Sequence, residues 1–364
     1  GDILLQQSDN DLTVGLRDPG DPSAVATTAS DHVTLQNWFE PTFQIDKFQF
    51  SDGTTIDVAG VTSVLNATSA GQTLTGGASG SDLLVGMGGD TLDGGAGNDI
   101  LVAGSSGDSL QGGSGNDTYV FARGDGSVAV QDTGGTDTLL LGGGIGAPDL
   151  VLQASGNDLV VGLRDPFNPD TPATGLGDHV TLQSWISSSS DRIENIQFAD
   201  GTVLDIGGIT QFINGTTGDE SLFGAAGASS LIIAGSGDDT LVAGSGNSIL
   251  VASTGNDLLL GGAGNDTLIA GTGSDTLNGD AGNDTYIYAR GDGQQVIFDD
   301  YEYITNVGAT IPVTTTTQEE VTDNKGHVIG TTTVTITTME TVPAGAMVRG
   351  DGGSDTLQFG AGIT

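Results

Sequence analysis

Apolar side chains recur at every ninth position in two blocks of the chain, residues 67–120 and 216–287. Within each nine-residue unit, glycine favours places one, two and four, an acidic or small polar residue takes place six, and place eight is apolar or aromatic. Glycines at these places allow backbone conformations that other residues avoid, which predicts a tight turn. The last three places predict a short strand whose middle side chain points inward. The place-eight residues are Leu83, Leu92, Leu101, Leu110, Tyr119, Leu241, Leu250, Leu259, Leu268, Leu277 and Tyr286.

The place-six residues form two stacked columns if two units complete one turn of a flattened helix of parallel strands. Each place-six side chain then lies beside the one two units later, which predicts that Asp90 faces Asp108 and that Asp99 faces Asp117. The place-six aspartates are Asp90, Asp99, Asp108, Asp117, Asp239, Asp257, Asp266, Asp275 and Asp284.

Stacked carboxylates indicate a metal site, because like charges about 4 Å apart repel by roughly 4 kcal/mol at an effective dielectric near 20. Carboxylates and exposed turn carbonyls suit calcium, which takes about six to eight oxygen ligands. Magnesium fits less well, and zinc is disfavoured because the chain has no cysteine and only 3 histidines. We therefore expect calcium between Asp239 and Asp257, between Asp257 and Asp275, and between Asp266 and Asp284.

Serine replaces aspartate at Ser230 and Ser248 in one column of the second block. These units either bind metal weakly or use the serine hydroxyl within the turn. Serine often bonds to its own turn, which favours the second interpretation.

The nonapeptides resemble those of the repeats-in-toxin (RTX) family, the haemolysin-type calcium-binding proteins. The resemblance implies an all-β fold of two calcium-bound parallel β-rolls, each preceded by a small β-meander cap. It also implies that several calcium ions are bound by the repeat aspartates and by loop carbonyls. Asp125 and Asp292, in the tail after each block, are candidates to complete the last site. The carbonyl candidates are Gly94, Ala96, Gly112, Ser114, Gly261, Ala263, Gly279 and Ala281.

A longer repeat surrounds the blocks, since residues 10–19 return as 157–166 and residues 31–38 return as 178–185. Alternating β-formers with turn signals predict a small β-meander in each copy. Both meanders, about residues 2–58 and 149–206, resemble the haemolysin-type calcium-binding related domain.

Three pairs of residues in the meanders admit a functional and a structural interpretation. Trp38 and Trp185 are candidates for a sugar-stacking platform, yet an aromatic repeated at one place of a meander favours core packing against the open end of a roll. His32 and His179 are likewise candidates for a binding site, but a structural role is favoured. Arg17 and Arg164, each beside an aspartate, are expected to stabilise turns.

One segment of the second copy, residues 301–347, has no counterpart in the first. It holds threonine-rich runs at 311–321 and 328–339, joined by the turn signature 323–326, which predicts a hairpin. A binding loop and a solvated extension of the sheet are both open interpretations. The expected division is a meander at 1–66, a roll with its tail at 67–148, a meander at 149–213, a roll at 214–300, the hairpin at 301–347 and a tail at 348–364.

Composition narrows the function classes. The chain has 47 acidic and 8 basic residues, a formal charge of −39, which argues against nucleic acid and anionic membranes as partners. Its 62 glycines raise the entropy cost of folding, so calcium is expected to supply much of the folding free energy. Calcium then takes the stabilising role that disulfides have in many extracellular proteins. The chain has no run of about 18 apolar residues, so no transmembrane segment is predicted. The absence of a starting methionine or signal peptide suggests an internal fragment of a larger secreted protein.

The resemblance implies a non-catalytic module that folds on binding calcium, within a large extracellular protein exported by the type I secretion machinery. Cytosolic calcium is too scarce for modules with dissociation constants on the order of 10⁻⁴ to 10⁻³ M, so folding is expected outside the cell. The alternative is a segment of an RTX surface adhesin or surface-layer protein that binds a host-surface or glycan ligand. An enzyme is the weakest interpretation, because no serine, histidine and carboxylate can be placed as a catalytic triad.

Overall fold

The computed structural model describes residues 3–16, 26–29, 31–40, 42–105, 107–289, 291–298, 310–322, 328–341 and 356–359. Their regular structure is almost entirely β, with short 3-10 helices η1 (Ala26–Thr28), η2 (Ala147–Asp149) and η3 (Ala173–Gly175). The chain divides into two compact units, Gly1–Gly207 and Gly208–Thr364. Among the described residues, none of the helices is long and apolar enough to cross a membrane.

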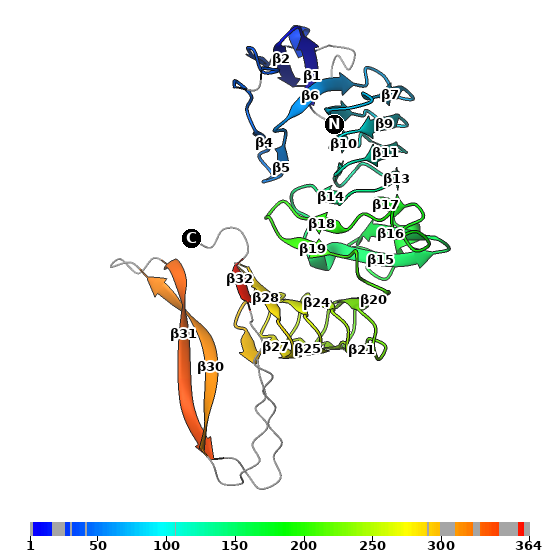
Figure 1. The fold of residues 1–364 in the computed structure, drawn as a ribbon. Helices are drawn as coiled ribbons and strands as arrows, with labels where there is room; N and C mark the ends of the chain where they lie inside the picture. The colour runs from blue at the N-terminus through cyan, green and yellow to red at the C-terminus, as the bar shows by residue number, and fades with distance from the viewer. Residues whose placement is uncertain are drawn as a thin grey trace. The chain divides into compact units, whose positions relative to one another are not determined.

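The first unit contains a parallel β-roll, which appears in Figure 1 as stacked strands from β6 to β14. The chain passes alternately between two sheets, so each coil contributes one strand to each. One sheet contains β6 (Val61–Asn66), β8 (Ser81–Val85), β10 (Ile100–Val102), β12 (Thr118–Phe121) and β14 (Thr138–Leu141). The other contains β7 (Thr73–Thr75), β9 (Thr91–Ala96), β11 (Ser109–Ser114) and β13 (Ser127–Gln131).

Interior leucines stack as the nine-residue period predicts. Leu92 pairs with Leu110, and Leu101 pairs with Tyr119, each across parallel strands. All four side chains are buried. The expected all-β class with parallel rolls is therefore confirmed.

The register predicted for the second nonapeptide of the first block, residues 76–84, is wrong by one residue. Leu84, not Leu83, pairs with Leu101 in the interior column. The turn between β8 and β9 is one residue shorter than the period requires, so the column shifts. As a result Asp82 takes the carboxylate position above Asp99, and its backbone N–H donates to Asp99 Oδ1 at 2.8 Å.

The second unit contains the second roll, drawn in green to yellow in Figure 1. One sheet contains β20 (Gln211–Asn214), β22 (Ser230–Ile233), β24 (Ile249–Val251), β26 (Thr267–Ile269), β28 (Thr285–Tyr288) and β32 (Thr356–Phe359). The other contains β21 (Ser221–Phe223), β23 (Thr240–Val242), β25 (Leu258–Ala263), β27 (Thr276–Ala281), β29 (Val296–Phe298), β30 (Thr310–Thr322) and β31 (Val328–Thr341). Antiparallel pairing of β30 with β31 confirms the two strands of the predicted hairpin, whose turn lies outside the described residues.

The first meander contains β1 (Ile3–Ser8), β2 (Asp11–Leu16), β3 (His32–Leu35), β4 (Lys47–Gln49) and β5 (Thr55–Asp57). Its Trp38 is buried and lies in one apolar cluster with Val85, Val102 and Val120 of the roll. The neighbouring position Leu101 points into the roll, so these valines project from its outer face. The meander therefore covers one sheet of the first roll.

The second meander contains β15 (Leu150–Ser155), β16 (Asp158–Leu163), β17 (His179–Leu182), β18 (Asn195–Gln197) and β19 (Val203–Asp205). It precedes the second roll in sequence but belongs to the first unit, because β17 pairs with β13 and β18 pairs with β14. The open edges of the first roll are thereby paired, which removes a template for aggregation. This pairing groups the two meanders with one roll.

The paired residues of the meanders have structural roles. Trp38 and Trp185 are at most 1% exposed, and their indole N–H groups donate to backbone carbonyls, so both are core residues. Trp38, however, packs on the outer face of the roll rather than at its open end. Each histidine contacts the backbone carbonyl three residues earlier through Nδ1, at 2.8 Å. The Arg164 guanidinium donates to the carbonyl of Pro169, within its own turn. Arg17 lies outside the described residues.

Candidate metal centre

Turns of each roll alternate between two edges. We call edge A the side where the chain leaves the sheet of β9 or β25 for the sheet of β10 or β26, and edge B the opposite side. The edge A turns considered below are 94–99, 112–117, 132–137, 243–248, 261–266 and 279–284. The edge B turns are 86–90, 103–108, 234–239, 252–257 and 270–275.

Place-six carboxylates stack along both edges. The backbone N–H of Asp90 donates to Asp108 Oδ1, and that of Asp99 donates to Asp117 Oδ1, both at 2.7 Å and across 18 residues. Ladders of the same kind run through the second roll, where the backbone N–H of Asp239 donates to Asp257 at 2.8 Å, that of Asp257 to Asp275 at 2.9 Å and that of Asp266 to Asp284 at 2.7 Å. One oxygen of each ladder carboxylate is thus occupied by the neighbouring coil.

The second carboxylate oxygen distinguishes the two edges. On edge B it accepts backbone N–H groups of its own turn, from Gly104 to Asp108 at 2.7 Å and from Gly271 to Asp275 at 3.0 Å. Met87 and Ser253 donate in the same way to Asp90 and Asp257, at 2.7 Å and 3.2 Å. These carboxylates are satisfied by the protein itself.

On edge A, Oδ2 of Asp99, Asp117, Asp137 and Asp266 is buried and has no hydrogen-bond partner among the described residues. Asp239 on edge B shares this property. A buried carboxylate oxygen without a partner is costly, so each of these positions calls for a cation or a proton.

The residue at place one explains the difference. Four edge A turns that end in aspartate begin with glycine, at Gly94, Gly112, Gly261 and Gly279, whereas four of the edge B turns begin with alanine. A Cβ at Gly94 would lie 2.4 Å from Asp99 Oδ2, and one at Gly112 would lie 2.3 Å from Asp117 Oδ2. Alanine is therefore incompatible with the geometry of these acidic turns, whereas the edge A turn that ends in Ser248 begins with Ala243.

Place two follows the same division. On edge A it has left-handed backbone, with φ of 96° at Gly95, 102° at Gly113 and 91° at Gly262. Carbonyl oxygens of the neighbouring coil lie against it, since a Cβ at Gly113 would be 2.1 Å from the oxygen of Gly95. Asp280 takes the same left-handed conformation in the turn 279–284, with φ of 69°. Edge A thus brings carboxylate and carbonyl oxygens close together, and hard oxygen donors of this kind fit calcium.

Burial dominates the electrostatics of these groups. Burial, assisted by neighbouring carboxylates, raises the pKa of Asp99 to about 6 and the pKa values of Asp117 and Asp266 to about 7. Burial also raises the pKa of Asp257 to about 6. The ionised rows are unfavourable without a counter-charge, which is the condition expected of a cation site.

The remaining predicted ligands fall into two groups. Asp125 and Asp292 accept the backbone N–H groups of Ala122 and Ala289 at 2.7 Å and 2.6 Å, each closing a local turn, and burial raises the pKa of Asp125 to about 6. The candidate carbonyl residues Gly94, Ala96, Gly112, Ser114, Gly261, Ala263, Gly279 and Ala281 all lie on edge A turns.

Ser248 hydrogen bonds within its own turn, as its sequence favours, whereas Ser230 bonds to a residue outside its turn. Ser248 Oγ donates to the carbonyl of Gly246 at 3.0 Å and accepts the N–H of Ser230 at 3.1 Å. Ser230 Oγ donates to Gln211 at 3.2 Å. Their hydroxyls take the places that carboxylates hold in the acidic repeats.

Further residues join the ladders outside the recognised pattern, among them Glu220, whose N–H donates to Asp239 Oδ1 at 2.8 Å. Asp82 heads edge A of the first roll, and Asp137 with Glu194 ends it, with Glu194 Oε2 accepting the N–H of Asp137 at 2.8 Å. Gln295 ends edge B of the second roll by accepting the N–H of Asp275 at 2.9 Å. Irregular spacing hid these residues, although a search for acidic or amide residues beyond each slip of the period would have found them.

The fold and its stacked acidic turns define a protein of the calcium-binding β-roll class. The sequence model of the RTX calcium-binding nonapeptide repeat matches in overlapping windows from 76–105 to 93–128 and from 214–250 to 260–294. That of the haemolysin-type calcium binding protein related domain matches residues 24–59 and 173–207. The chain belongs to the RTX, haemolysin-type calcium-binding family, whose nonapeptide repeats bind calcium.

Among solved structures, the chain is similar to the extracellular lipase LipA from Serratia marcescens, with 19% identity and a TM-score of 0.22. The match covers 69% of this chain and 37% of the lipase chain. The chain thus spans little more than a third of that protein. No curated protein matches the sequence.

Proposed function

We propose that this chain is a non-catalytic module that folds on binding calcium, within a large protein exported by a type I secretion route to the cell exterior or surface. The observation that carries the proposal is the row of buried, unpaired Oδ2 atoms on edge A. Calcium would supply the counter-charge for these oxygens. The protein supplies a carboxylate from one coil, carbonyls from the next, and glycines that keep the space between them open.

The charge balance supports folding after export. Each ladder aspartate must be ionised to bind metal, and the chain as a whole carries −39. At cytosolic calcium the folded state would bury several unpaired carboxylates, whereas extracellular calcium can occupy sites with dissociation constants on the order of 10⁻⁴ to 10⁻³ M. The module is accordingly expected to remain unfolded inside the cell and to fold outside.

The calcium sites are proposed along edge A, including the predicted Asp266–Asp284 pair. Asp257 and Asp275 on edge B already receive backbone N–H groups, so the proposal places no ion between them, and the site that the sequence predicts there is tested by the variants below. The finer division of the chain into six segments also stays a proposal, supported by the two matches to the related-domain model and the two blocks of nonapeptide matches.

A pair of variants in consecutive nonapeptides tests the proposal. Asp266→Asn removes an unpaired oxygen from edge A, and Asp275→Asn removes one that a backbone N–H already occupies on edge B. Isothermal titration calorimetry should show several calcium ions for the unchanged chain, fewer for Asp266→Asn, and the unchanged number for Asp275→Asn. The second variant should instead lose about 1 to 3 kcal/mol of stability in calcium, because Gly271 N–H loses its acceptor.

Calorimetry that detects no calcium binding to the unchanged chain would refute the proposed function. Equal losses of calcium from the two variants would refute only the assignment to edge A. Circular dichroism at saturating calcium checks that both variants fold.

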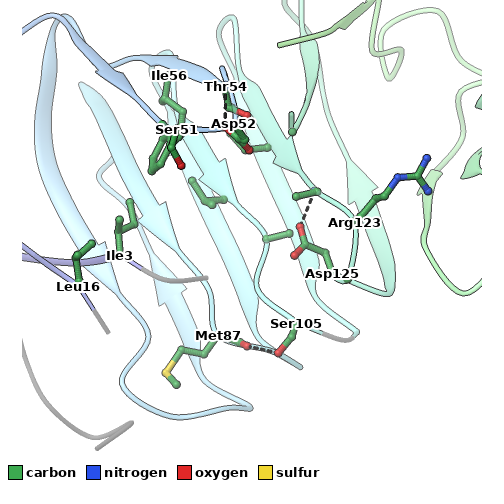
Figure 2. Close-up of a pocket in the computed structure, with 17 residues that line it drawn as sticks. Ile3, Leu16, Ser51, Asp52, Thr54, Ile56, Met87, Ser105, Arg123 and Asp125 are labelled. Atoms are coloured by element: carbon green, nitrogen blue, oxygen red, sulfur yellow. Dashed lines mark hydrogen bonds between the residues drawn. The ribbon is translucent and has the colours of Figure 1, made fainter. Parts of the chain in front are cut away.

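The alternative, a ligand-binding segment of a surface protein, is supported by a cleft of about 720 Å³ in the first unit. It is lined by apolar residues such as Ile3 and Ile56 together with Asp52, Arg123 and Asp125. Figure 2 shows the Arg123 side chain extending away from Asp125. The combination of apolar surface with a few polar groups is typical of small-ligand sites.

A glycan array tests the alternative on the full chain, on Arg123→Ala and on a variant without residues 301–347. Without these residues β29 is followed directly by β32, as β13 is followed by β14 in the first copy. If the module binds surface glycans, the full chain should bind the array and at least one of the two variants should lose that binding. Absence of binding by the full chain would exclude a glycan ligand.

A further inference from the structure

The turn 132–137 lies beyond the matched nonapeptides of the first block, which end at residue 128. It nevertheless continues edge A, because β13 ends at Gln131 and β14 begins at Thr138. The N–H of Asp117 donates to Asp137 Oδ1 at 2.7 Å, in the manner of the upstream ladder. Asp137 therefore acts as the place-six residue of an additional coil.

Place one of this turn carries a carboxylate where the acidic edge A turns upstream have bare glycine. Asp132 occupies the place that corresponds to Gly94 and Gly112. Carboxylate oxygens of Asp117, Asp132 and Asp137 all lie within 4.8 Å of one another. Each residue is at most 1% exposed. Three buried acidic groups thus converge where a nonapeptide pair supplies two.

The hydrogen bonds around this cluster leave two oxygens open. Asp132 Oδ2 accepts the hydroxyl of Tyr119 at 2.9 Å, and Tyr119 in turn accepts the N–H of Gly112 at 2.9 Å. Asp132 Oδ1 accepts backbone N–H groups of Thr133 and of Gly134. By contrast, Oδ2 of Asp117 and of Asp137 has no hydrogen-bond partner in the part of the chain that the structure describes.

Within the described ranges, no ion pair joins a basic side chain to the cluster. The ion pair found within the described ranges joins Arg123 to Asp149, away from these three residues. Two unpaired buried oxygens beside a third carboxylate fixed by a tyrosine therefore indicate a bound cation rather than an internal salt bridge.

We propose that Asp117, Asp132 and Asp137 bind a calcium ion at the end of the first roll, in a site that the nonapeptide pattern does not include. The inference rests on the proposed function, since it assumes that edge A binds calcium. Calcium affinity rises with the number of charged ligands, so three carboxylates should bind more tightly than the two of a repeat pair. This site should consequently fill first during a calcium titration.

Its position gives the ion a structural role. Asp137 N–H donates to Glu194 of the second meander, and β14 pairs with β18 of the same meander. Neutralising the cluster therefore stabilises the coil on which the meander's strands are added. Filling this site should couple the order of the roll to the order of its cap.

The test uses the full chain with Asp132→Gly, which restores the glycine found upstream, and Asp132→Asn, which keeps the size of the side chain. Exposed Asp46→Asn is the charge-matched control. Both Asp132 variants keep the Asp117–Asp137 pair, so calorimetry should show loss of the tightest phase, and the calcium midpoint of folding should rise on the order of tenfold. Asp46→Asn should match the unchanged chain.

Each outcome is decisive. If the unchanged chain binds no calcium, the proposed function fails and this inference fails with it. If it binds calcium but both Asp132 variants, shown by circular dichroism to fold at saturating calcium, keep the tightest phase and the calcium midpoint of the unchanged chain, the inference alone is overturned. Should Asp132→Gly not fold, the same comparison is made on Asp132→Asn.

Discussion

Removing calcium with a chelator should abolish most of the β circular dichroism of this chain. The reason lies in what holds the rolls together. Each coil contributes one interior side chain per strand, such as Leu92 and Leu101, so the apolar core of a roll is narrow. Against it stand the ordering of 62 glycines and the burial of unpaired carboxylates.

Calcium changes this balance because it binds the folded state at several positions. A ligand at about 1,000 times its dissociation constant stabilises the folded state by about 4 kcal/mol per site. A few such sites reach the whole stability of an ordinary domain, which is about 5 to 15 kcal/mol. Loss of calcium is therefore the largest single perturbation expected for this protein.

Far-UV circular dichroism and thermal melting in excess chelator, followed by calcium addition, measure the effect. The melting temperature should rise with calcium concentration, and magnesium at equal concentration should restore little of the signal, because it demands a more rigid octahedral shell. A chelated sample that retains its full β signal and melting temperature would show that metal does not drive folding.

The sequence predicts the rolls well because their physical cause is local and repeated. One apolar side chain every nine residues, preceded by glycines, is sufficient to place Leu101 over Tyr119 and to stack the aspartates. The exchange of Leu84 for Leu83 in the interior column was not predictable from the period, because it depends on the length of a single glycine-rich turn.

The division between the edges had a signal in the sequence that the place-six column alone does not reveal. Gly94 and Ala103 occupy the same place of successive units, but only the turn of Ala103 leaves room for a Cβ. In that turn both oxygens of Asp108 accept backbone N–H groups. Asp132 escaped detection for a related reason, since it stands at a glycine place and beyond the slip of the period. The pairing of the second meander with the first roll is a long-range property that no local pattern encodes.

Acidification should partly replace calcium. Burial raises the pKa of Asp99 to about 6 and those of Asp117 and Asp266 to about 7, from an ordinary value of 3.8. Between about pH 4 and pH 7 the folded chain therefore holds more protons than the unfolded chain, and stability falls as pH rises through this window. The contribution is fully present below about pH 4 and lost above about pH 7.

Each unit of raised pKa corresponds to about 1.4 kcal/mol, and several groups act together. The chelated protein should thus gain β signal when the pH is lowered from 8 to 5, measured by far-UV circular dichroism. In the presence of calcium the trend reverses, because protons compete for the same oxygens and the apparent calcium affinity declines.

Reduced surface repulsion is the competing explanation, since the chain carries −39 at pH 7. Salt at about 0.5 M and pH 8 screens exposed charges strongly but buried ones much less, so it separates the two effects. We expect salt to restore little of the β signal that acid restores. Equal recovery in salt and in acid would assign the transition to overall charge, whereas a smaller acid response in Asp117→Asn and Asp266→Asn than in Asp46→Asn would assign it to the buried carboxylates of edge A.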